Sequence, residues 1–183
     1  MSASPPSNEQ RTFCALLCLG CLLSLVFCAA RADAGSGVAA GTLKNYRYDL
    51  AFAKRQAPLK NGFFQTGKTP EDFLSVRLMK YCVGDLNKDR LNDAAVVLAA
   101  SPMGSGSFFE LTALYTKPSD PTIRQSNSIV LGDRIKIHAL RIRSGKILVD
   151  YDTHGPKDPS CCPKTRTART FRLLKGQLTE ERK

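Results

Sequence analysis

The sequence contains only two histidines in 183 residues, and this scarcity narrows the catalytic chemistry that it can support. Hydrolysis by a Ser or Cys nucleophile needs a histidine base and an acid that orients it. His138 falls on the polar side of an alternating segment, and His154 lies in a loop near Asp152 and Asp158. No pair of carboxylates for glycoside hydrolysis and no cofactor-binding fingerprint stands out. The sequence therefore favours a protein without catalytic activity, and a Cys–His pair that uses His154 stays open as the alternative.

The sequence also lacks internal repeats and any helical hydrophobic stripe longer than two turns. Short alternating segments, separated by Gly, Pro and Asn turns, instead predict eight or nine β-strands. We therefore expect an all-β fold, an antiparallel sandwich or barrel, and the absence of repeats excludes a β-propeller. The clearest strands are expected over residues 73–83, 94–100 and 134–142, with a bulge near Ala139 where the alternation reverses. Residues 117–125 contain two prolines and are expected to form an exposed loop.

The first 34 residues resemble an export signal. An apolar run over residues 13–30, interrupted by one serine, is preceded by a basic residue and followed by Ala32-Asp33-Ala34, which fits a signal-peptidase site before Gly35. An uncleaved membrane anchor is one alternative, because about 18 apolar residues are the lower limit for a span. A lipoprotein is another, because the small residue Gly20 precedes Cys21. We predict an exported protein, periplasmic or extracellular, with no stable membrane span once the signal is removed.

The rest of the chain is long enough for one domain with its own core. Its expected organisation after the signal peptide of residues 1–34 is a flexible tether over residues 35–43, a single β domain over residues 44–178, and a frayed, charged C-terminus over residues 179–183.

Acidic residues are few relative to basic ones: 16 Asp and Glu stand against 27 Lys and Arg, for a net charge of +11. The signal segment contains two residues of each sign, so this excess belongs to the β domain. Such a charge favours an anionic partner, either an envelope component or an acidic protein. A merely soluble basic surface is the alternative. The basic residues are not interleaved with an aromatic ladder, which argues against binding to single-stranded nucleic acid.

One stretch carries a recognisable chemical pattern, the acidic loop of residues 85–93. Asp85, Asn87 and Asp89 occur at every second position, Asp93 closes the set, and the backbone carbonyl of Leu91 lies between them. Oxygen ligands at this spacing are what calcium requires, so calcium is the predicted cofactor. The alternative is an Asx-rich turn without metal, in which the side chains accept hydrogen bonds from backbone amides.

Two basic residues in this loop weaken the calcium prediction. Arg90 occupies the position where a glycine would make the sharp turn, and a non-glycine residue in the left-handed conformation costs about 1 kcal/mol. Lys88 and Arg90 also bring positive charge close to the predicted ligands.

The acidic loop resembles the calcium loops of FG-GAP/VCBS repeats, whose pattern is Asp-x-Asp/Asn-x-Asp-Gly-x-x-Asp followed by an apolar strand. It is also similar to the first nine positions of an EF-hand loop, but Val96 stands where the EF-hand has its bidentate glutamate. These resemblances cover about 16 residues and imply a single structural calcium loop.

A second resemblance covers more of the chain. The motifs that carry it are Gly84-Asp85-Leu86-Asn87, Asp93-Ala94-Ala95-Val96-Val97, Gly104-Ser105-Gly106, Leu131-Gly132-Asp133-Arg134 and Gly155-Pro156-Lys157-Asp158-Pro159-Ser160-Cys161-Cys162-Pro163. In this order they resemble a family of uncharacterised exported bacterial β-proteins. The resemblance implies a periplasmic or envelope location and an all-β fold, and no chemistry.

Three cysteines remain after the signal: Cys82, Cys161 and Cys162. In an oxidising compartment we expect one of the adjacent pair to bond to Cys82, closing about 80 residues and contributing about 4 kcal/mol. A disulfide between Cys161 and Cys162, redox-active or not, is the second reading. Capture of a soft metal by both of them with His154 is the third.

Overall fold

The computed structural model describes residues 37–104, 106–156 and 158–181. These residues form twelve β-strands and one four-residue helix, and every strand pairing is antiparallel. The elements are α2 (Ala40–Leu43), β1 (Arg47–Asp49), β2 (Gln56–Pro58), β3 (Phe63–Thr66), β4 (Leu74–Gly84), β5 (Asp93–Pro102), β6 (Phe108–Lys117), β7 (Asp120–Gln125), β8 (Ile129–Asp133), β9 (Lys136–Arg143), β10 (Lys146–Thr153), β11 (Thr165–Leu174) and β12 (Gln177–Glu181).

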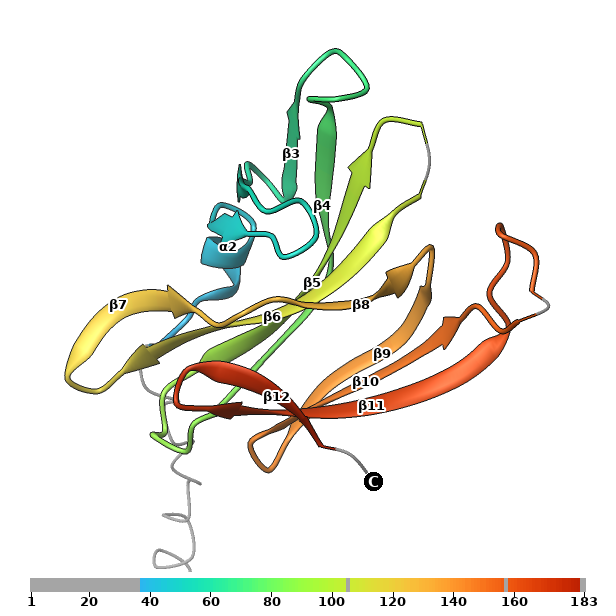
Figure 1. The fold of residues 1–183 in the computed structure, drawn as a ribbon. Helices are drawn as coiled ribbons and strands as arrows, with labels where there is room; N and C mark the ends of the chain where they lie inside the picture. The colour runs from blue at the N-terminus through green and yellow to red at the C-terminus, as the bar shows by residue number, and fades with distance from the viewer. Residues whose placement is uncertain (1–36, 105, 157, 182–183) are drawn as a thin grey trace, which may run out of the picture. The chain divides into compact units, whose positions relative to one another are not determined.

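The strands form three sheets (Figure 1). The largest has the order β3-β4-β5-β6-β7, with β8 also paired to β6. The second has the order β12-β11-β10-β9, and β1 and β2 form the third. The all-β prediction is confirmed, but eight or nine strands was too few, and the described strands do not close into a barrel. No helix in the described residues is long and apolar enough to cross a membrane.

Strand β5 is the centre of the six-stranded sheet and is buried on both faces. Its residues Ala95, Val97 and Ala99 contribute to one core cluster, whereas Ala94, Val96, Leu98 and Ala100 contribute to another. This two-sided burial explains why the stretch after the acidic loop is continuously apolar instead of alternating.

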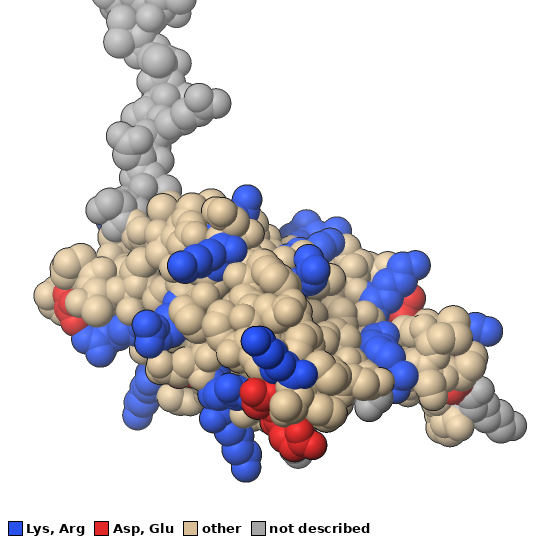
Figure 2. Space-filling model, turned by 90° about the horizontal axis from the view of Figure 1, so that it is seen from above, with Lys and Arg blue, Asp and Glu red and all other residues tan. Residues whose placement is uncertain are grey.

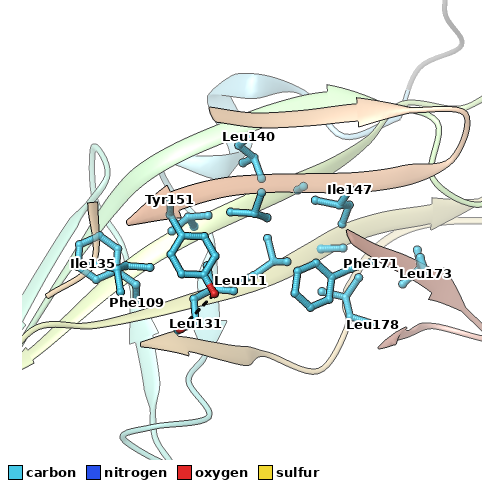
Figure 3. Close-up of a cluster of buried hydrophobic side chains, with 14 of the residues drawn as sticks. Phe109, Leu111, Leu131, Ile135, Leu140, Ile147, Tyr151, Phe171, Leu173 and Leu178 are labelled. Atoms are coloured by element: carbon cyan, nitrogen blue, oxygen red, sulfur yellow. Dashed lines mark hydrogen bonds between the residues drawn. The ribbon is translucent and has the colours of Figure 1, made fainter. Parts of the chain in front are cut away.

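The first core cluster joins the six-stranded sheet to the four-stranded sheet (Figure 3). Phe109 and Leu111 of β6 face side chains of β9–β12, among which Ile147 and Phe171 are fully buried. Burying one such side chain contributes about 1.5–3 kcal/mol. The hydroxyl of Tyr151 donates a hydrogen bond to the carbonyl of Leu131 at 3.5 Å, so its polar end is also satisfied.

The second cluster covers the opposite face of the six-stranded sheet with the N-terminal part of the described chain. Val38 and Leu43 are buried in it beside Tyr48, and the amide of Val38 donates to the carbonyl of Asn92 at 2.6 Å. The expected flexible tether over residues 35–43 is therefore wrong for residues 37–43, because two apolar side chains anchor this segment. Residues 35–36 and the predicted signal lie outside the described residues.

Two further expectations fail at strands on the edges of sheets. Residues 120–125 form β7, which pairs with β6, although residues 117–125 were expected to be a loop. Pro121 is tolerated there because an edge strand can lack one amide donor. Likewise, residues 179–181 were expected to fray but belong to β12, where Arg169 of β11 holds the carboxylate of Glu180.

The predicted bulge in the segment 134–142 is confirmed. The register between β9 and β10 shifts between Asp150 and Tyr151, which pair with Ala139 and Ile137. His138 is therefore the extra residue, and the shift keeps Ile137 and Leu140 facing the core on either side of it.

Candidate functional site

The acidic loop connects β4 to β5, and its polar side chains are engaged with its own backbone. Asp85 accepts hydrogen bonds from the amides of Lys88 (2.6 Å) and Arg90 (3.0 Å). Asn87 accepts from the amide of Asp89, and Asp89 accepts from the amide of Leu91. These are consecutive Asx turns, in which short polar side chains replace the hydrogen bonds of regular structure.

Asp93 is the buried anchor of the acidic loop. Its side chain has no exposed surface, and Oδ2 accepts from the amides of Leu86 at 2.9 Å and Asn87 at 3.3 Å. Burial raises the pKa of Asp93 to about 6, against the lowering effect of the backbone amide of Leu86. Asp93 thus ties the first turn of the loop to the first residue of β5.

Lys88 and Arg90 both adopt the left-handed conformation, with φ of 65° and 68°. The expectation for Arg90 is confirmed, and it carries the cost of about 1 kcal/mol that glycine would avoid. The hydrogen bonds from both amides to Asp85 offset this strain.

Most of the predicted calcium ligands already have hydrogen-bond partners within the loop. Asp85, Asn87, Asp89 and one oxygen of Asp93 accept backbone hydrogen bonds, whereas Asp93 Oδ1 is buried without a partner among the described residues. The amide nitrogen of Asn87 donates to the carboxylate of Asp89, 2.9 Å away. Among the described residues, no group of three or more His, Cys, Asp or Glu side chains is placed to hold a metal ion. The geometry thus favours the hydrogen-bonded turn. Calcium binding stays a prediction, which thermal unfolding in calcium and in a chelator tests.

The acidic loop packs on the turn between β9 and β10. Gly145, in this turn, has φ of 73°, and a Cβ there would meet the carbonyl of Leu86 at 3.3 Å and the Lys88 side chain at 3.6 Å. A pocket of about 370 Å³ lies at this contact, and its polar lining includes Lys88, Lys146 of β10 and Arg172 of β11. We call it the basic pocket. The acidic loop thus contributes a lysine, Lys88, to the basic pocket.

The basic pocket lies at one end of a larger charged surface, the outward face of the four-stranded sheet. We call this the basic face, and it is defined by side chains that pair across β9, β10 and β11 opposite to the core side. Its Lys and Arg residues are Lys136, Arg141, Arg143, Lys146, Arg166 and Arg172. Its acidic residues are Asp150, Asp152 and Glu181.

All three acidic residues of the basic face are already ion-paired. Asp150 and Asp152 lie 2.5 and 3.6 Å from the guanidinium of Arg166, and the carboxylate of Glu181 contacts Lys146 and Arg172. Arg141 and Arg143 are exposed and have no ion-pair or hydrogen-bond partner for their side chains among the described residues. The face therefore retains an excess of unneutralised positive charge at the end that contains Arg141 and Arg143.

Cys161 and Cys162 form a disulfide with each other in the loop between β10 and β11, the cysteine loop of residues 154–164, and both are exposed. Asp158 closes this loop, because Oδ2 accepts from the amides of Gly155 and Lys164 at 2.9 Å each. These backbone hydrogen bonds hold the pKa of Asp158 below its usual value. The loop is therefore held by contacts other than the disulfide.

The expected disulfide from Cys82 does not form, and Cys82 is a free thiol. Cys82 lies on β4 two residues before Gly84, which packs against Ile142 near the β9–β10 turn. The cysteine loop begins at the other end of β10, eight residues away, or about 26 Å along a strand (Figure 1). Burial raises the pKa of the Cys82 thiol to about 11, which keeps the thiol protonated at neutral pH.

The two histidines occupy separate places. His138 Nε2 lies 2.7 Å from Asp152 Oδ2, and this contact lowers the pKa of Asp152. His154 begins the cysteine loop, and its Nε2 is buried without a hydrogen-bond partner among the described residues. Neither arrangement contains the nucleophile, base and orienting acid of a hydrolase in the part of the chain that the structure describes.

These features define an all-β protein with a basic face, a basic pocket and an exposed disulfide loop. Comparison with protein families, curated proteins and solved structures found no match for this chain. The resemblances to an exported bacterial β-protein family and to FG-GAP/VCBS loops thus stay predictions, as does export.

Proposed function

We propose that this protein is a non-catalytic exported binding domain that holds an anionic partner through its basic face. The observation that carries the proposal is the imbalance on that face, where six Lys and Arg side chains stand against three acidic ones that are all ion-paired. Arg141 and Arg143 have exposed guanidinium groups without intramolecular partners among the described residues, so an incoming anion displaces no ion pair there.

The rest of the surface supports attraction at longer range. Lys and Arg side chains are spread over the face shown in Figure 2, with few acidic side chains between them, in agreement with the net charge of +11. Such a field raises the rate at which an anionic polymer or surface is encountered. The specific contacts come from the basic face, since scattered charges alone do not fix an orientation.

The double charge reversal Arg141→Glu with Arg143→Glu should weaken binding to an acidic polysaccharide, and to vesicles containing phosphatidylglycerol, at least about tenfold, since each basic residue at an anionic surface contributes about 1 kcal/mol. Binding of the unaltered protein should also weaken as salt is added. Sedimentation with vesicles and retention on immobilised polysaccharide measure both effects.

The matched control is Lys54→Glu with Lys60→Glu, an equal change in net charge at exposed lysines of the N-terminal part of the domain. An equal loss of binding in this control would show that only net charge matters and would contradict a role for the basic face. Absence of binding to both probes at low salt would contradict the proposal as a whole.

A second candidate function is thiol–disulfide exchange at Cys161–Cys162. The observation that favours it is the exposed disulfide between adjacent cysteines in a loop that Asp158 holds closed. A dithiol donor would supply two electrons and two protons and would itself become a disulfide, leaving two neighbouring thiols on the protein. Such thiols, with His154, are also the ligands of the soft-metal alternative.

Replacing both Cys161 and Cys162 with serine separates the two candidates. Under thiol–disulfide exchange, the variant should lose the ability to oxidise a small dithiol, whereas binding to the acidic polysaccharide should be unchanged. If the unaltered protein does not oxidise the dithiol, the second candidate is rejected. Thiol titration of the reduced protein with and without copper tests the soft-metal alternative.

A further inference from the structure

We propose that the basic pocket binds a phosphate group, either free or as the phosphomonoester headgroup of a lipid. This inference rests on the proposed function, since it assigns the basic face a defined site for one anionic group of its partner. The pocket is an open depression of about 370 Å³, which has room for a phosphate with part of the molecule that carries it.

Three separate elements each contribute one cationic side chain to the pocket. Lys88 comes from the acidic loop, Lys146 from the start of β10, and Arg172 from β11, where it is the register partner of Lys146. Arg172 offers the planar fork of donors that matches two oxygens of a phosphate, and the lysines act as point charges. Arg143, the other register partner of Lys146, adds positive charge beside the pocket.

The position of Lys88 is set by the fold of the acidic loop. Its backbone is left-handed and its amide is bonded to Asp85, while its side chain crosses the turn at Gly145. The carboxylates of Asp85 and Asp89 accept backbone amides within the loop. The acidic side chains of this loop therefore stabilise its backbone conformation. Lys88 is the exposed side chain that this conformation directs toward the basic pocket.

Glu181 of β12 contacts two of the cations of the pocket, Lys146 at 2.9 Å and Arg172. With Glu181 included, the three cations keep an excess of two positive charges. A phosphomonoester carries nearly two negative charges at neutral pH and matches this excess, whereas a carboxylate or sulfate ester carries one. Glu181 competes with the phosphate for Lys146 and Arg172.

Calorimetric titration of the protein with pyrophosphate tests the site. Lys146→Gln should weaken pyrophosphate binding about tenfold, because one charge-assisted contact is lost. Glu181→Gln should strengthen it about threefold, because the competing carboxylate is removed. Lys60→Gln, at an exposed lysine outside the basic face, should leave it unchanged. Melting curves of each variant confirm that it is folded.

A second arm distinguishes the source of the phosphate. If vesicles of phosphatidylcholine with phosphatidic acid bind the protein and Lys146→Gln weakens that binding, the group is a lipid headgroup. If pyrophosphate binds and these vesicles do not, the group is a soluble phosphate. Absence of pyrophosphate binding, or equal binding by Lys146→Gln and the unaltered protein, would contradict phosphate binding in the basic pocket. Such a result leaves the proposed function standing if Arg141→Glu with Arg143→Glu weakens binding to the polysaccharide as expected.

Discussion

Replacing Glu110 with alanine is expected to lower the free energy of unfolding by about 2–3 kcal/mol. Glu110 lies on β6 with no exposed surface, and its two carboxylate oxygens accept from the amides of Ala51 (2.7 Å) and Phe52 (3.0 Å). These bonds hold the loop between β1 and β2 against the six-stranded sheet, where Phe52 stacks on Phe108. Alanine removes both acceptors at once, and chemical denaturation measures the loss.

The half-buried carboxylate of Asp120 is the control, because it pairs with Arg124 at the surface of β7. Asp120→Ala should change the free energy of unfolding by less than about 1 kcal/mol, as is usual for exposed pairs. An effect of Glu110→Ala no larger than this would show that the loop between β1 and β2 is held by its apolar contacts alone.

The same residue predicts a pH dependence. Burial raises the pKa of Glu110 above its ordinary value of 4.5, against the lowering effect of the amides of Ala51 and Phe52. The Glu110 carboxyl group therefore binds a proton more tightly in the folded protein than in the unfolded chain. Its contribution to the free energy of unfolding is fully present below pH 4.5. As the pH rises through the folded pKa, this contribution is lost. The stability of the unaltered protein relative to Glu110→Gln should therefore fall from pH 4.5 upward.

The longest apolar and alternating segments predicted their strands well, and the edge strands were missed for physical reasons. The stretch after the acidic loop is buried on both faces, so hydrophobicity alone identifies β5. β7 contains Pro121 and exposed polar residues, and it is a strand only because β6 offers it hydrogen bonds. β12 is likewise specified by its partner β11, and local propensity does not reveal such long-range pairing.

The candidate site shows the same limit. Spacing identified the acidic loop, and it correctly placed Arg90 in a left-handed turn. Spacing could not indicate that Lys88 meets Lys146 and Arg172, because these residues are joined only by the packing of the loop on the β9–β10 turn. The disulfide expectation failed for a related reason, since the distance between Cys82 and the cysteine loop is set by the length of β10.

Replacing Asp93 with alanine is expected to cost about 2–4 kcal/mol and to damage the basic pocket as well. Asp93 is fully buried, and its bonds to the amides of Leu86 and Asn87 are the link between the acidic loop and β5. Without them the amide of Leu86 stays buried with no acceptor, and the loop no longer holds Lys88 across Gly145. Denaturant unfolding measures the first effect, and pyrophosphate titration well below the melting temperature measures the second.

Asp93→Asn separates the two roles, because asparagine keeps one acceptor oxygen in nearly the same shape. Compared with Asp93→Ala, this variant should have a higher free energy of unfolding and a higher affinity for pyrophosphate. If Asp93→Ala unfolds more easily but binds pyrophosphate as well as the unaltered protein, the acidic loop does not position Lys88, and the pocket depends on Lys146 and Arg172 alone. If both measurements fall together and asparagine partly restores both, the acids of this loop serve the basic pocket by shaping the backbone that presents Lys88.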